Sequence, residues 1–98
     1  MNARPIMDRR IVLTPTAFAE LVVWEVPEPL AGSNHRYKYR LALVGNGVCV
    51  LRFDNEAGKG DHIHVGGAER PYRFTDVDGL IADFRTHVGR WLDEHGNS

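Results

Sequence analysis

Hydrophobic and polar residues alternate along much of the first two thirds of the chain, as they do in strands with one buried face. Residues 18–26 are rich in β-branched and aromatic side chains and end at Pro27, and residues 36–44 alternate cleanly. A Gly-Asn-Gly turn at 45–47 then leads into residues 48–53. The pattern therefore predicts three consecutive antiparallel strands.

The length of the turn decides which residues face each other in the second hairpin. A two-residue turn pairs position 45 with 48 and sets Leu41 opposite Arg52, whereas a three-residue turn pairs 44 with 48 and sets Leu41 opposite Leu51. Only the three-residue turn gives one continuous apolar face, so we expect it. In that register Arg40 lies directly opposite Arg52, and Lys38 shares their face.

Two further segments extend this meander. Residues 62–65 predict a short strand in which Ile63 and Val65 face the core and the two histidines face away. Residues 71–74 predict a last edge strand, because the proline that opens the segment disfavours a central position. Residues 1–13 predict an extra edge strand or a short arm.

Apolar side chains at helical spacing predict one long helix over residues 76–95. Thr75 is suited to cap its start, with Asp78 three residues on, and Gly96 to end it. The apolar stripe should lie on the sheet and consists of Val77, Leu80, Ile81, Phe84, Val88, Trp91 and Leu92. These elements predict a single α+β domain over residues 1–98, an antiparallel meander of about four strands with the C-terminal helix packed on one face.

Composition narrows the ligands and the cellular location that we expect for this domain. The formal net charge of −1 argues against binding an extended nucleic-acid duplex. The charge is uneven, because residues 1–52 hold seven of the twelve Arg and Lys and residues 53–98 hold nine of the thirteen acids. The single Cys49 excludes an internal disulfide, so we expect a cytoplasmic protein with this thiol packed in the core. No apolar segment is long enough to span a membrane, and the N-terminus does not follow the pattern of a signal peptide.

Residues 54–64 combine acids, a lysine and two histidines around two glycines. His62 and His64 are two apart, so both imidazoles leave the same face of an extended strand. Three interpretations of the pair remain open: exposed histidines without a function, a divalent-metal site completed by Asp54 or Asp61, and acid–base catalysis without a metal. In the third, one imidazole accepts a proton while the other donates one to a leaving oxygen. That is the minimum needed to cleave RNA through its own 2′-hydroxyl.

Basic side chains predicted on the same open face would bind a phosphate beside these histidines. Arg40 across from Arg52 is a repulsive arrangement that a bound anion relieves. We expect Lys38 to act with His62 and His64 in catalysis by stabilising charge that develops on the phosphate. The residues expected to bind the phosphate are Arg40, Arg52, Lys59 and Asp54.

Several motifs in order resemble the TumE-like family of small bacterial and archaeal proteins. They are ELVVWEVP at 20–27, HRYKYRL at 35–41, FDN at 53–55, GKGDHIH at 58–64 and PYRF at 71–74, followed by the helix at 80–91. The similarity extends from about residue 11 to residue 91. Members of that family are toxins of two-gene toxin–antitoxin modules, and their partner is typically a small helix-turn-helix antitoxin. The resemblance implies a toxin with a protein partner and leaves its reaction open.

The residues and the resemblance together predict a type II toxin that cleaves RNA through His62 and His64, without a metal or another cofactor. One alternative is a non-enzymatic domain that docks a protein or nucleic acid through a basic sheet face, and another is a metal-dependent nuclease. The edges at 18–26 or 71–74 would allow a homodimer by strand pairing.

Overall fold

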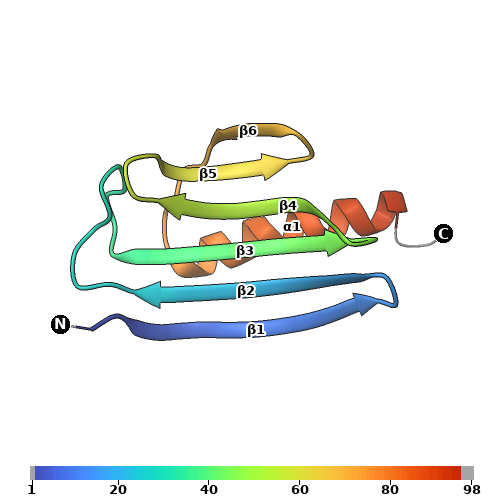
Figure 1. Cartoon of the computed structure of the whole chain (residues 1–98), viewed down its shortest axis with the longest axis horizontal. Helices are drawn as coiled ribbons and strands as arrows, with labels where there is room; N and C mark the ends of the chain where they lie inside the picture. The colour runs from blue at the N-terminus through green and yellow to red at the C-terminus, as the bar shows by residue number, and fades with distance from the viewer. Residues whose placement is uncertain (1, 96–98) are drawn as a thin grey trace.

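Six antiparallel strands and one helix make up the computed structural model, which describes residues 2–95 (Figure 1). The strands are hydrogen-bonded in chain order, so the sheet is an uninterrupted meander. The predicted α+β class is confirmed, with six strands where about four were expected. The elements are β1 (Arg4–Thr14), β2 (Ala17–Glu25), β3 (Tyr37–Gly45), β4 (Val48–Glu56), β5 (Gly60–Val65), β6 (Ala68–Pro71) and α1 (Val77–His95).

The two edges of the sheet are not those predicted. The segment expected as a strand or an arm is the 11-residue edge strand β1, whose mixed polarity fits its mostly exposed side chains. The other edge, β6, covers residues 68–71 instead of 71–74, because the turn at 66–67 sends the chain straight back along β5. β2 pairs with β1 on one side and β3 on the other, so the prediction that residues 18–26 form a free edge was wrong.

The β3–β4 hairpin has the two-residue turn, not the predicted three-residue turn. Asn46 and Gly47 have positive φ angles of 53° and 77°, as the tightest hairpin turns require. Val50 is then a surplus residue, a bulge, and beyond it Leu43 pairs with Leu51. The bulge restores the continuous apolar face that we had expected the longer turn to supply.

This register changes the neighbours of three residues. Arg40 pairs with Asp54 and Arg52 pairs with Ala42, so the prediction of Arg40 opposite Arg52 was wrong. Cys49 precedes the bulge and pairs with Val44 on the open side, so it is exposed and not the core thiol that we predicted.

The core lies between α1 and the centre of the sheet. Leu80, Phe84 and Val88 of α1 are buried, and the rest of the predicted stripe packs against the same cluster. Asp76, not Thr75, caps the helix, because its Oδ1 accepts a hydrogen bond of 2.6 Å from the Gly79 amide. Gly96, predicted to end the helix, lies outside the described residues. In the part of the chain that is described, α1 is not apolar enough to cross a membrane.

The helix covers one face of the sheet and leaves the other open (Figure 1). On β5, Ile63 is buried toward the helix, whereas His62 and His64 are only partly buried on the opposite face. The prediction that the two imidazoles leave the uncovered side of the sheet is therefore confirmed.

Candidate functional site

The candidate residues lie in two neighbouring rows that cross the open face of the sheet. Arg40, Asp54 and His62 are successive cross-strand partners on β3, β4 and β5. The next row runs through Ala42 and continues with Arg52, His64 and Glu69 on β4, β5 and β6. Cross-strand partners are within side-chain reach of each other. We call Arg52, Asp54, His62, His64 and Glu69 the histidine cluster.

His64 lies at the centre of this cluster. Its Nε2 is 3.1 Å from a terminal nitrogen of Arg52, 3.2 Å from Glu69 Oε2 and 3.4 Å from Asp54 Oδ1. An unprotonated Nε2 accepts a hydrogen bond from Arg52, and a protonated one can donate to either carboxylate. Both protonation states of this nitrogen therefore find a partner without movement of the backbone.

His62 is held in a different way. Its Nδ1 lies 3.0 Å from the carbonyl oxygen of Gly60, which can only accept, so Nδ1 carries a proton. In the neutral imidazole Nε2 is then the atom with the lone pair. It lies 3.9 Å from Glu69 Oε1, beyond direct hydrogen-bond distance. The centroids of the His62 and His64 rings are 6.5 Å apart.

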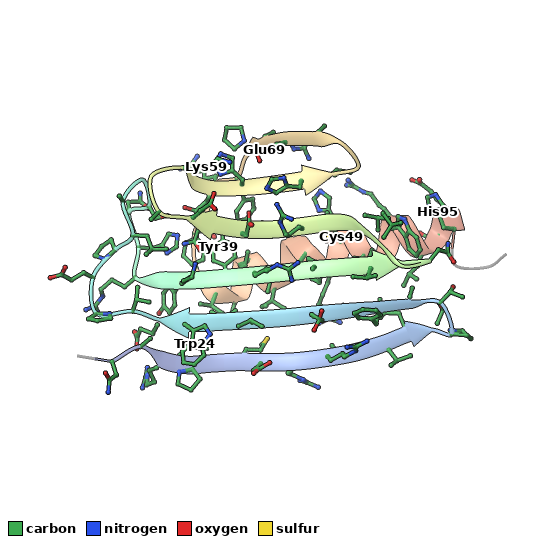
Figure 2. The ribbon with its side chains drawn as sticks, in the orientation of Figure 1. Trp24, Tyr39, Cys49, Lys59, Glu69 and His95 are labelled. Carbon is green, nitrogen blue, oxygen red and sulfur yellow. The ribbon has the colours of Figure 1, made fainter. Side chains whose placement is uncertain are left out.

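Glu69 joins the cluster from β6, and our reading of the sequence missed it. Besides contacting both histidines, its Oε2 lies 3.9 Å from Lys59 Nζ, and Figure 2 shows the two side chains near each other at the β5–β6 edge. The predicted edge strand began at residue 71, so the prediction placed Glu69 in the turn before it. The paired glycines at 66–67 were the signal for an earlier hairpin, which places residue 69 beside His64.

The open face is mixed in charge, not basic as expected. Arg52 Nε is buried 3.0 Å from Asp54 Oδ2 and, within the described chain, has no well-aligned hydrogen-bond partner. Glu69 adds a second carboxylate to the same group. Arg40 remains exposed as the cross-strand neighbour of Asp54, which lies inside β4.

Lys38 stands apart from the cluster. It pairs with Trp24 in another row on β3, two strands and roughly 10 Å away from β5. The structure thus brings His62, His64, Arg52, Asp54 and Lys59 into one group, with Arg40 at its border and Lys38 beyond it. Across residues 2–95, no group of three or more His, Cys, Asp or Glu has the arrangement to hold a metal ion.

A second group of acid and histidine lies on the helix side of β5. The carboxylate of Asp61 accepts hydrogen bonds from Ser33 Oγ at 2.8 Å, His35 Nε2 at 2.7 Å and Tyr39 Oη at 2.6 Å. The His35 proton is on Nε2, because Nδ1 accepts a hydrogen bond from the Tyr37 amide. We call Ser33, His35, Tyr39 and Asp61 the Asp61 network.

The Asp61 network is largely shielded from solvent and fully paired. The side chains of His35 and Asp61 are each 9% exposed, and the His35 ring stacks on Phe74 with 3.8 Å between centroids. Burial, and then the hydrogen bond to Asp61, raise the pKa of Tyr39 far above its ordinary value of 10.0, so its hydroxyl remains a donor. The network fixes residues 33–39 against β5, and its nitrogens and oxygens are occupied by one another.

Comparison with known proteins gives a family and no individual relative. A family model described as Toxin TumE matches residues 3–92, a range that contains all six strands, the histidine cluster and the Asp61 network. Neither the curated proteins nor the solved structures include a match to the chain.

Proposed function

Because the chain belongs to the TumE toxin family, we propose that it is the toxin of a type II toxin–antitoxin module and arrests growth by cleaving RNA without a metal ion. The observation that carries this proposal is the pair of imidazoles on the open face. His62 keeps a free lone pair on Nε2, and His64 Nε2 has partners in both protonation states. One base and one acid, side by side and partly open to solvent, are what RNA cleavage through the 2′-hydroxyl requires.

In the proposed reaction each histidine carries out one proton transfer. His62 Nε2 takes the proton of a 2′-hydroxyl, whose oxygen attacks the adjacent phosphorus. The bond from phosphorus to the 5′-oxygen of the next nucleotide breaks, and protonated His64 donates its proton to that oxygen. The products are a 2′,3′-cyclic phosphate and a free 5′-hydroxyl. Ring centroids 6.5 Å apart let both imidazoles reach oxygens of one phosphodiester.

The charged neighbours position and stabilise the reacting groups. Arg52 donates to the non-bridging oxygens of the phosphate, where negative charge grows during attack, and Arg40 and Lys59 add positive charge on either side. The carboxylates of Asp54 and Glu69 lie 3.4 and 3.2 Å from His64 Nε2 and stabilise the protonated imidazole until its proton passes to the leaving oxygen. Lys38 is too far from β5 for the scissile phosphate, so we assign it to a neighbouring phosphate of the RNA strand.

A toxin of this kind needs a neutralising partner in its own cell. We propose that a small helix-turn-helix antitoxin fills this role, and that it is encoded beside the toxin gene. The mixed charge of the open face suits this arrangement, because a protein can match alternating acids and bases more closely than a phosphate backbone can.

The decisive experiment incubates the purified chain with total RNA, with and without a chelator, and identifies the new ends. We expect cleavage that the chelator does not change, with 2′,3′-cyclic phosphate and 5′-hydroxyl products. Loss of cleavage on chelation would favour the metal-dependent nuclease instead. Growth arrest without any RNA cleavage would favour the domain that acts by binding.

A further inference from the structure

A polar pocket of about 550 Å³ opens next to His62 where three loops meet at the start of β5. The loops contribute residues 32–34, 59–62 and 71–74. His62 and Lys59 line the pocket and also contact Glu69, so the pocket is continuous with the histidine cluster. Its volume lies within the roughly 300–1,000 Å³ that is typical of small-molecule sites.

The floor of the pocket is backbone held in a fixed position. Gly32 and Gly60 have φ angles of 92° and 76°, and a Cβ on either would come within 2.8 Å of the other's backbone. Beneath them Ser33 is tied to Asp61, and the Gly58 amide donates a 2.6 Å hydrogen bond to the Ala31 carbonyl. The Asp61 network thereby pre-organises the pocket, which lowers the cost of ordering it around a ligand.

The walls offer positive charge, aromatic surface and amide groups together. Lys59 and Arg73 are exposed cations, Tyr72 and Phe74 are partly exposed rings, and Asn34 carries an exposed side-chain amide. Aromatic and guanidinium planes stack on nucleobases, amides recognise base edges, and cations bind phosphate. The groove of about 440 Å³ between β1 and α1 has a mainly apolar lining instead, so the two concave surfaces fit different ligands.

We propose that this pocket binds one nucleotide of the RNA, the one adjacent to the phosphate held by the histidine cluster, and so gives the toxin its base preference. The inference rests on the proposed ribonuclease function and specifies its substrate further. The base contacts the lining formed by residues 72–74, Asn34 contacts its edge, and Lys59 stands between the base and the scissile phosphate.

The test titrates the intact chain with each of the four nucleoside 3′-monophosphates and with inorganic phosphate. Calorimetry measures the affinity of each, and NMR measures the amide shift changes that each causes. We expect one nucleotide to bind at least tenfold more tightly than phosphate and to shift the amides of residues 32–34 and 71–74. Arg73→Ala and Asn34→Ala should each weaken that nucleotide tenfold or more. Arg70→Ala is the matched control, because Arg70 is an exposed arginine of β6 that lines a different cavity.

Cleavage assays separate this inference from the proposed function. With an oligonucleotide that holds the preferred base, Arg73→Ala should raise KM and leave kcat nearly unchanged. Nucleotide binding without RNA cleavage would refute the ribonuclease and retain the pocket. RNA cleavage with no nucleotide binding, or with binding no tighter than that of phosphate, would overturn the pocket and retain the ribonuclease. Unchanged affinity in Arg73→Ala and Asn34→Ala would also overturn it.

Discussion

Asp61 and His62 are consecutive residues of β5, yet they belong to two groups on opposite faces that differ in almost every physical respect. In the Asp61 network each donor has one fixed acceptor, and the side chains of Asp61 and His35 are 9% exposed. In the histidine cluster one nitrogen of His64 has three competing neighbours, and that side chain is 24% exposed. On our proposal, the same residue types therefore stabilise the fold on one face and transfer protons on the other.

The largest effect should come from removing either histidine of the histidine cluster. His62→Ala and His64→Ala should each lower RNA cleavage by about 10²–10⁴-fold, because each removes a general acid or base. Both should lose no more than about 1 kcal/mol in free energy of unfolding, since the side chains are partly exposed and their ion-pair contacts are weak in solvent. Cleavage rates and urea denaturation measure the two quantities separately.

His35→Ala is the opposing variant. It should unfold at a clearly lower urea concentration, because the stack on Phe74 and a donor to Asp61 are lost, while kcat per folded molecule is retained. His95→Ala, at the C-terminal end of α1, serves as the histidine control for the cleavage measurement. Full cleavage in His62→Ala and His64→Ala would end the catalytic assignment.

Asp61→Asn should produce the next largest effect, on stability. The amide retains one acceptor but turns an N–H group toward donors that previously met a carboxylate, so we expect a loss of about 3 kcal/mol. Asp54→Asn, the matched change on the open face, should cost less than about 1 kcal/mol, because that side chain is 25% exposed where Asp61 is 9% exposed. Equal losses in urea denaturation would show that the two groups are not physically distinct.

The Asp61 network should also weaken at alkaline pH. The pKa of Tyr39 is raised in the folded protein, so above pH 10 the unfolded chain loses that proton while the folded chain keeps it. Stability is then fully present below pH 10 and falls as the pH rises, by about 1.4 kcal/mol per pH unit for this tyrosine. Urea midpoints from pH 8 to 11 should decline less steeply in Tyr39→Phe, and parallel declines would contradict the assignment.

The smallest effect should come from Lys38. Because it lies two strands from β5, Lys38→Ala should raise KM for RNA by about threefold at most and leave kcat unchanged. Arg52→Ala should instead lower kcat, since Arg52 touches His64 directly. A large fall in kcat for Lys38→Ala would instead support the catalytic role that we predicted for Lys38 from its position on the open face.

Periodicity was sufficient to predict the elements whose two faces differ in polarity. The alternation in residues 36–44, the helical stripe from Leu80 to Trp91 and the outward direction of both histidines all follow from burial on one side. β1 was less clear, because an edge strand that is mostly exposed has little polarity contrast to read. The alternation therefore predicted which face of the sheet each site residue occupies. Glu69 was missed because the last strand was predicted at residues 71–74.

Register and long-range pairing were beyond the sequence pattern. Both turn lengths that we weighed assumed regular strands, and neither included a surplus residue at Val50, so Cys49 and Arg40 received the wrong neighbours. The Asp61 network joins positions up to 28 residues apart, and no local spacing marks Ser33 or His35 as partners of Asp61. These features depend on how the loops close in three dimensions.

The bulge also sets where this hairpin can change in length. Removing Val50 would leave a regular ladder with Leu43 still opposite Leu51 and every later partner unchanged. Removing a residue between 51 and 55 would reverse the sides of all that follow in β4 and carry charged groups beneath the helix. Deletions within β4 should therefore be tolerated at position 50 and not between 51 and 55, because only the former leaves the sides of the later residues unchanged.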